Sequence, residues 1–152
     1  MQRARQLRRA GKRIVFANGC FDLLHPGHVT LLERAKGLGD TLVVAVNSDR
    51  SVRRLKGPQR PILPQRVRAT LLAALASVDY VTMFDEPTPY RLIAAIQPDV
   101  LVKGADWNVG HIIGQRVVVK RGGRVVRIPL VGGYSTTGLI QRIVRRARSA
   151  RP

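Results

Sequence analysis

Short unbroken apolar runs alternate along the chain with segments in which apolar residues recur at every third or fourth position. The apolar runs predict strands that are buried on both faces, over residues 13–17, 42–46, 80–84, 100–102 and 124–128. The periodic segments predict helices between them, over residues 28–36, 65–76 and 88–97. A last helix is expected from residue 135 onward, and its inward side would carry Leu139, Ile140, Ile143 and Val144. Strands that alternate with helices are typical of an α/β protein whose parallel sheet is covered on both faces.

Some segments stay open at this level. Either Gly37 or Gly39 would give the first helix a left-handed C-cap. Residues 108–122 fit either a strand or a short helix, and residues 1–12 fit either a basic helix or a disordered lead-in. We therefore expect one folded domain over residues 13–146, between a basic lead-in (1–12) and a basic C-terminal tail (147–152). Both basic ends are expected to be dispensable for chemistry.

The 152 residues carry a formal net charge of +18, which is concentrated towards the two ends. Residues 1–21 contain six Lys or Arg and no acid, and the residues from 107 onward contain ten and no acid. This charge suits polyanionic ligands and predicts non-specific attraction to nucleic acid that weakens with salt. A dedicated nucleic-acid-binding protein would combine a basic stripe with stacking aromatic residues. Aromatic residues make up only 5% of this chain, so that class ranks low.

Two features bear on the compartment. No apolar run reaches the length of a membrane span and no signal-peptide pattern precedes the first strand, so we expect no membrane association. The single cysteine, Cys20, cannot form an internal disulfide, which fits a reducing cytoplasm. Without a catalytic partner beside it, Cys20 is interpreted as a small packing residue.

The strongest candidate for chemistry is the junction between the first strand and the first helix. His25 and His28 stand three residues apart around Pro26-Gly27, where the helix is expected to begin. A helix N-terminus offers unpaired N–H groups and the positive end of the helix dipole, and the imidazoles add further donors. The junction therefore predicts a phosphate-binding site. The ordinary alternative is a histidine that only caps the helix.

Three further stretches follow predicted strands, namely residues 52–57, 102–107 and 135–137. Taken alone, each has an ordinary interpretation: a solvated basic loop, a buried tryptophan and a serine N-cap. In an open parallel sheet, however, ligands bind at the carboxyl ends of the strands, so we expect all four stretches to face one site. Lys56, next to Gly57 and a proline, is expected to lie on a mobile loop. Neither a GxGxxG fingerprint nor a P-loop motif is present.

The run Asn18-Gly19-Cys20-Phe21-Asp22 followed by His25-Pro26-Gly27-His28 resembles the HxGH signature of the cytidylyltransferase-like nucleotidyltransferase superfamily. Members of that superfamily join a nucleoside triphosphate to a phosphorylated acceptor. The resemblance covers residues 14–145 and looks closest to the bacterial D-glycero-D-manno-heptose 1-phosphate adenylyltransferases, with similarity to the glycerol-3-phosphate cytidylyltransferases. It implies a Rossmann-like open parallel five-stranded sheet in the order 3-2-1-4-5.

The resemblance also implies a role for each matching residue. His25, His28 and Lys56 would be catalytic, with both histidines on the triphosphate. The nucleotide-binding residues that it implies are Asn18, Gly19, Cys20, Phe21, Asp22, Arg68, Lys103, Gly104, Asp106, Trp107, Ser135, Thr136 and Thr137. One departure concerns Arg68, because Gln65-Arg66-Val67 precedes it where the family pattern has an acidic residue.

The implied reaction moves AMP from ATP to a sugar 1-phosphate, most closely D-glycero-D-manno-heptose 1-phosphate, and releases pyrophosphate. Mg²⁺ would be held mainly through the triphosphate, with Asp22 and Asp106 as indirect ligands. The first alternative is a CTP-dependent enzyme acting on glycerol 3-phosphate or a similar polyol phosphate. A non-catalytic nucleic-acid-binding protein is the more distant one. The base, the acceptor and the oligomeric state, a homodimer included, stay open.

Overall fold

The computed structural model describes residues 2–105, 112–129 and 131–150. Its centre is a five-stranded sheet in the order β3-β2-β1-β4-β5, in which every neighbouring pair is parallel. The strands are β1 (Ile14–Gly19), β2 (Thr41–Asn47), β3 (Tyr80–Phe84), β4 (Val100–Gly104) and β5 (Arg124–Ile128). The expected α/β class, strand order and central β1–β4 pair are confirmed. All carboxyl ends lie at one edge of the sheet, where Ala17 of β1 pairs with Val102 of β4.

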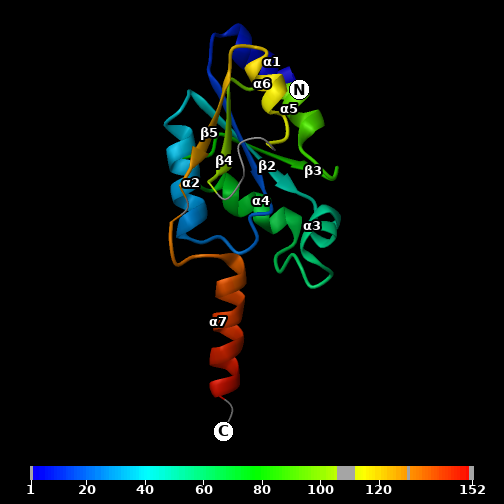
Figure 1. The fold of residues 1–152 in the computed structure, drawn as a ribbon, viewed down its shortest axis with the longest axis vertical. Helices are drawn as coiled ribbons and strands as arrows, with labels where there is room; N and C mark the ends of the chain where they lie inside the picture. The colour runs from blue at the N-terminus through cyan, green and yellow to red at the C-terminus, as the bar shows by residue number, and fades with distance from the viewer. Residues whose placement is uncertain (1, 106–111, 130, 151–152) are drawn as a thin grey trace.

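Helices cover both faces of this sheet (Figure 1). On one face lie α2 (Pro26–Lys36) and α4 (Gln65–Ala73), and their Leu32, Ala35 and Leu72 are completely buried. On the other lie α1 (Gln2–Arg9), α5 (Tyr90–Ile96) and α6 (Gln115–Val119), with Ala4, Ile93 and Val118 buried. The ambiguous segment 108–122 thus contains a helix where it is described. A further helix, α3 (Asp49–Lys56), follows β2 directly.

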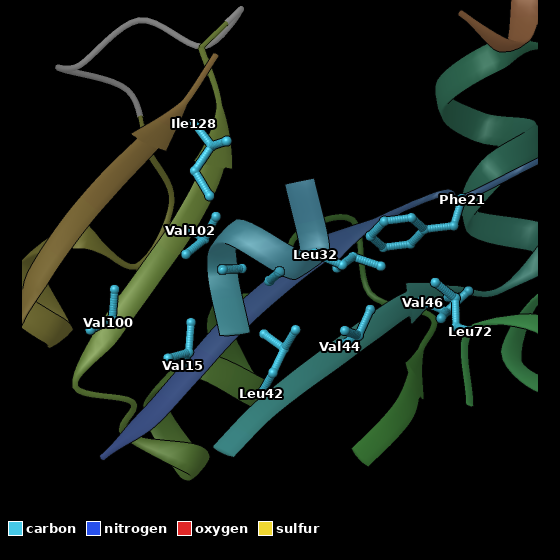
Figure 2. Close-up of a cluster of buried hydrophobic side chains, with 12 residues drawn as sticks. Val15, Phe21, Leu32, Leu42, Val44, Val46, Leu72, Val100, Val102 and Ile128 are labelled. Atoms are coloured by element: carbon cyan, nitrogen blue, oxygen red, sulfur yellow. The ribbon is translucent and has the colours of Figure 1, made fainter. Parts of the chain in front are cut away.

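The strands are apolar throughout because alternate residues fill two separate cores. Val15, Val44 and Val102 face the core beneath α2 and α4, as Figure 2 shows. Phe16, Val43 and Leu101, which pair across the three central strands, face the opposite core. Burial on both sides explains why these runs show no alternation of polar and apolar residues.

The predicted left-handed cap of the first helix is wrong. The C-cap residue Gly37 has a φ of −64° and a ψ of −7°, which is right-handed backbone. Gly39 serves close packing instead, because a Cβ there would lie 2.8 Å from the carbonyl oxygen of Arg13 and 2.8 Å from Cγ2 of Val15. The glycine pair correctly predicted the end of the helix. At Gly39, however, the chain passes so close to β1 that there is no room for a side chain, and this explains the glycine without a positive φ.

The inward side expected for the last helix is also wrong. This helix, α7 (Thr136–Ser149), has no buried residue, and Ile143 and Val144 are 61% and 42% exposed. It extends away from the sheet, with the C-terminus at its far end (Figure 1). A helical apolar pattern identifies a face that can be buried, but not whether the fold supplies something to cover it. Here both faces of the sheet already carry other helices.

The basic lead-in is a folded helix rather than a disordered segment. Ala4 of α1 is buried, Leu7 packs against the same core, and the Arg3 guanidinium lies 5.7 Å from the ring centroid of Tyr80 in β3. Arg3 Nε also donates a hydrogen bond of 2.8 Å to the Tyr80 hydroxyl. The helix therefore covers part of the sheet in addition to carrying charge.

Removal of residues 1–11 is expected to lower the free energy of unfolding by about 1–3 kcal/mol, because it uncovers apolar surface beside β1 and β3. Turnover at 25 °C should stay close to that of the full chain, since α1 lies away from the carboxyl edge of the sheet. Urea unfolding and a turnover assay on the same samples check both statements. Removal of residues 147–152 is the control and should change neither quantity. Lost turnover in a trimmed protein that remains folded would place α1 in the site.

Candidate nucleotide-binding site

The connection from β1 to α2 has an unusual backbone conformation. Phe21 and Leu23 have φ angles of 47° and 53°, in the left-handed region that non-glycine residues rarely adopt. His25 then takes the N-cap position with extended backbone, and Pro26 occupies the first helical turn, where its missing N–H costs nothing. The His25 side chain makes no capping hydrogen bond. Helix capping therefore does not explain His25.

The two histidines form a stacked pair at the start of α2. Their ring centroids lie 3.8 Å apart with 22° between the planes, and the Phe21 ring meets His28 edge-on at 5.4 Å. The Nδ1 atoms of both rings are buried and have no hydrogen-bond partner among the described residues. Buried polar atoms are normally paired, so two unpaired nitrogens in one ring pair mark this turn as more than a structural element.

Burial also sets the charge of the pair. It lowers the pKa of His28 to about 4, with a smaller contribution from the neighbouring His25 that outweighs the opposing effect of Asp22. Burial likewise lowers the pKa of His25. Both rings are therefore neutral at pH 7 in the free protein, and each offers one N–H donor and one acceptor. An arriving phosphate would favour the protonated form, since an opposite charge raises the pKa of an imidazole.

Gly27 leaves room for the His25 ring. A Cβ at position 27 would lie 3.0 Å from both Cε1 and Nδ1 of that ring, so Gly27→Ala should push the ring aside. We expect turnover to fall by about tenfold or more, because small misplacements of reacting groups are costly, while thermal stability stays unchanged. Steady-state kinetics and thermal unfolding together test this.

Gly37→Ala at the other end of α2 is the matched control for Gly27→Ala. A Cβ there would meet only ordinary contacts, the nearest being the Arg34 carbonyl oxygen at 3.5 Å. Its turnover should equal that of the unmodified protein. Wild-type turnover in Gly27→Ala as well would mean that the position of the His25 ring does not matter.

The central strands place a second pair of polar side chains at this edge. The ammonium group of Lys103, near the end of β4, donates a 2.6 Å hydrogen bond to Oδ1 of Asn18 on β1. Lys103 is only 7% exposed, so its charge is buried at the carboxyl edge of the sheet. Gly104 ends β4 and pairs with Ile128. Asp106 and Trp107, which the resemblance places in the nucleoside pocket, lie outside the described residues.

Lys56 is the last residue of α3 and is exposed, so the expectation of a loop position is wrong, although Gly57 does follow with a φ of 94°. The positive charge of Lys56 acts on Cys20 in the β1–α2 connection. Burial raises the pKa of the Cys20 thiol. The positive charges of Lys56, Arg68 and Arg60 lower it, but their effect is smaller than that of burial. Cys20 is therefore protonated at neutral pH and is no nucleophile, while three cations surround this part of the edge.

Arg68 does not reach the open edge. Its side chain is completely buried, and its guanidinium donates hydrogen bonds to the carbonyl oxygens of Leu63 (2.9 Å), Cys20 (2.5 Å) and Asn47 (2.8 Å). It also pairs with the Asp49 carboxylate at 2.8 Å. These contacts tie the ends of β1 and β2 together, so Arg68 holds the floor of the site in shape and has no donor facing outward in the described structure.

Asp22 is buried as well, and its carboxylate is fully engaged. It accepts hydrogen bonds from Nε of Arg60 at 2.7 Å and from the backbone N–H groups of Ile62 and Leu63 at 2.9–3.0 Å. These bonds hold its pKa below the usual range even though burial acts in the opposite direction. The glycine and prolines of residues 57–61 predict a loop here, but the bonds from Arg60, Ile62 and Leu63 to Asp22 were not predicted from the sequence.

The start of α7 lies beside the same connection. Ser135 is the N-cap, as expected, and its hydroxyl accepts a 3.0 Å hydrogen bond from the N–H of Gly138. The Thr136 hydroxyl donates a 2.6 Å hydrogen bond to the carbonyl oxygen of Asp22. Thr137 is exposed. The helix N-terminus is therefore anchored to the β1–α2 connection at Asp22, 114 residues away from Thr136 along the chain.

An open parallel sheet with a histidine pair, buried cations and two helix N-termini at its carboxyl edge is an arrangement in which α/β proteins bind phosphorylated ligands. The cytidylyltransferase-like family model matches residues 16–142. Curated relatives named bifunctional protein HldE are 55% identical over 139 residues in Syntrophotalea carbinolica and 58% identical over 135 residues in Koribacter versatilis. These matches cover 91% and 89% of this chain but only 28% of either relative.

The solved structures include a lipopolysaccharide core biosynthesis protein from Thermoplasma volcanium. It is 32% identical, superimposes with a TM-score of 0.65, and the match covers 80% of this chain and 98% of that one. The chain belongs to the cytidylyltransferase-like family and is a nucleotidyltransferase. None of the described helices combines the length and apolarity that crossing a bilayer demands.

Proposed function

We propose that this chain transfers AMP from ATP to a sugar 1-phosphate, giving an ADP-sugar and pyrophosphate. The observation that carries the proposal is the neutral His25–His28 pair at the N-terminus of α2, beside the ends of β1 and β4. The family match and the names of the relatives support the reaction class. The resemblance to heptose 1-phosphate adenylyltransferases makes D-glycero-D-manno-heptose 1-phosphate the acceptor we propose first.

In the proposed reaction an oxygen of the acceptor phosphate forms a bond to the α-phosphorus of ATP, and the bond from that phosphorus to the bridging oxygen of pyrophosphate breaks. The acceptor is already an anion, so no protein nucleophile or general base is needed. His25 and His28 would donate hydrogen bonds to α-phosphate oxygens as charge builds on them. Lys56 would approach the leaving pyrophosphate, and the anchored start of α7 would hold the outer phosphates.

Lys103 and Asn18 would shape the floor beneath the nucleotide. Catalysis then consists of positioning and charge stabilisation, which agrees with the absence of a nucleophile–base pair among the described residues of this edge. Arg68 is proposed to act only by fixing the strand ends, in place of the direct nucleotide contact that the resemblance implies.

The proposed reaction uses Mg²⁺ as the partner of the triphosphate. Among residues 2–105, 112–129 and 131–150, no group of three or more His, Cys, Asp or Glu side chains could hold a metal ion. Asp22 is unsuited to the indirect role suggested above, because Arg60 and two backbone N–H groups already occupy its oxygens. The ion would thus arrive bound to ATP, where it neutralises charge on the phosphates.

The test is pyrophosphate release with ATP or CTP against a panel of sugar 1-phosphates and polyol phosphates. We expect ATP with a heptose 1-phosphate to give the highest kcat/KM. CTP with glycerol 3-phosphate giving the highest value would favour the cytidylyltransferase alternative. The proposal would be overturned if no pair of nucleotide and acceptor gave pyrophosphate release above the uncatalysed rate, while circular dichroism showed that the protein is folded.

A further inference from the structure

We infer that Asp22 is a positioning residue that couples the histidine turn, the segment 60–63 and the start of α7, so that all three hold one arrangement around the phosphates. This inference rests on the proposed function for its kinetic part. Asp22 touches no reacting atom in this scheme. It acts through the three stretches that it joins, each of which carries or adjoins a residue assigned to phosphate binding.

The first link runs through the Asp22 side chain. The residue is 1% exposed, and its two oxygens accept three donors from the segment 60–63: Arg60 Nε, Ile62 N–H and Leu63 N–H. The Arg60 side chain is only 16% exposed, so this ion pair is shielded from water. Leu63 in turn offers its carbonyl oxygen to Arg68. The segment that follows Lys56 and Gly57 is thus fixed to the end of β1 by a buried charge.

The second link runs through the Asp22 backbone. Its carbonyl oxygen accepts the Thr136 hydroxyl at 2.6 Å, and Thr136 is the first residue of α7. The N–H groups of Gly138 and Leu139 next to it are bonded to the Ser135 hydroxyl and carbonyl oxygens. The orientation of this helix N-terminus therefore depends on where the carbonyl group of Asp22 points.

The third link is the strained backbone around Asp22. Phe21 and Leu23, the residues on either side of it, both have a positive φ. Such conformations cost about 1–3 kcal/mol each and persist only where surrounding contacts enforce them. This backbone also sets the direction of the Phe21 ring, which packs edge-on against His28 at 5.4 Å. The bonds to Asp22 act on this backbone together with the burial of Phe21 in the core, so we expect their loss to let the histidine turn relax.

A purely structural carboxylate would stabilise the fold without linking these stretches. The chain offers such a residue for comparison in Asp79, whose Oδ2 accepts the Leu42 N–H at 2.7 Å and the Lys36 ammonium at 2.6 Å. Asp79 immediately precedes β3 and bonds to the start of β2, at the opposite edge of the sheet from the histidines. Asp79→Asn is therefore the matched control: it removes a similar charge from a similar pattern of bonds outside the site.

The experiment combines amide hydrogen exchange with steady-state kinetics on Asp22→Asn and Asp79→Asn in the full chain. For Asp22→Asn we expect faster exchange at Ile62 and Leu63 and, across the molecule, at Gly138 and Leu139. We also expect kcat to fall by roughly 10–100-fold with a smaller change in KM, because misplacement reduces turnover more than binding. Asp79→Asn should leave these amides and kcat unchanged. Unchanged exchange at residues 138–139 in Asp22→Asn, or unchanged kcat once Ile62 and Leu63 are released, would overturn the inference.

Thr136→Val gives the reciprocal test and covers the case in which Asp22→Asn does not fold. Valine keeps the shape of threonine but cannot donate to the Asp22 carbonyl oxygen. If Asp22 couples the stretches, this change at the start of α7 must also speed exchange at Ile62 and Leu63. Faster exchange confined to residues 136–139 would mean that no coupling exists. Hydrogen exchange can be measured without turnover. An inactive wild-type protein would therefore count against the proposed function, but the exchange data would still test the coupling through Asp22.

Discussion

Replacement of His28 by alanine is expected to lower turnover by roughly 10²–10³, the usual effect of removing one pre-organised donor from a developing oxyanion. The fold should remain intact, because the His28 side chain is only partly buried and makes no hydrogen bond through its Nδ1 atom. Nucleotide affinity should fall much less than turnover, since the interaction is strongest in the transition state. Turnover and nucleotide binding measured on the same variant separate the two effects.

His28→Asn sharpens this prediction. His28 is a neutral donor in the free protein because burial lowers its pKa to about 4, and an asparagine amide is also a neutral donor. His28→Asn should therefore recover part of the turnover that His28→Ala loses. Thr30→Ala, two positions further along α2, is the control for general damage to the helix. A His28→Ala protein that unfolds early but turns over at the wild-type rate would favour a structural role for the ring.

The second large effect is on stability at acidic pH. The pKa of His28 is about 4 in the folded protein against 6.5 for a free histidine, so the unfolded state binds more protons between these values. The stabilisation is fully present above pH 6.5 and is lost as the pH falls through 4. A shift of this size corresponds to about 3 kcal/mol in the free energy of unfolding. His25, whose pKa is also lowered by burial, acts in the same direction.

Urea unfolding at a series of pH values between 7 and 4 measures this loss. His28→Ala should flatten the curve over that range, because it removes the group whose protonation state changes on unfolding. Acidic residues also contribute to any acid-induced loss, so the difference between the two proteins is the decisive quantity. Parallel curves for wild type and His28→Ala would mean that His28 titrates normally in the folded protein.

The core of the fold could be predicted from the sequence because local pattern and tertiary environment agree there. Unbroken runs such as Val43-Val44-Ala45-Val46 are buried on both sides, and this environment is what such runs indicate. The last helix could not be placed in the same way. Leu139, Ile140, Ile143 and Val144 form a correct helical stripe, yet the fold leaves that stripe without a cover. Apolar periodicity predicts that a segment is helical, but it does not predict which part of the protein will cover its apolar face.

In the candidate site too, contacts between residues close in sequence could be predicted and contacts between distant residues could not. His25 and His28 could be found because the strand, the turn and the helix start are contiguous in sequence. The bonds of Asp22 to Arg60 and to Thr136 join residues 38 and 114 positions apart, and no local pattern encodes such pairs. Arg68 shows the opposite case. The resemblance implies a ligand contact, whereas in the described structure the guanidinium is buried and donates to the carbonyl oxygens of Cys20 and Asn47.

The strand order has a consequence for the way the chain folds. β1 pairs on one side with β2, 27 residues further on (Val15 with Leu42), and on the other with β4, 85 residues further on (Val15 with Val100). Closing the longer loop costs only about 1 kcal/mol more in chain entropy, so the larger difference is one of timing. During synthesis the half-sheet β3-β2-β1 can assemble as soon as residue 84 is available. Until residue 102 follows, β1, whose first four residues are apolar and buried in the folded protein, presents an unpaired edge. That interval is the stage at which this sheet is most exposed to intermolecular pairing, and the arrival of β4 both ends it and completes the edge at which the histidines lie.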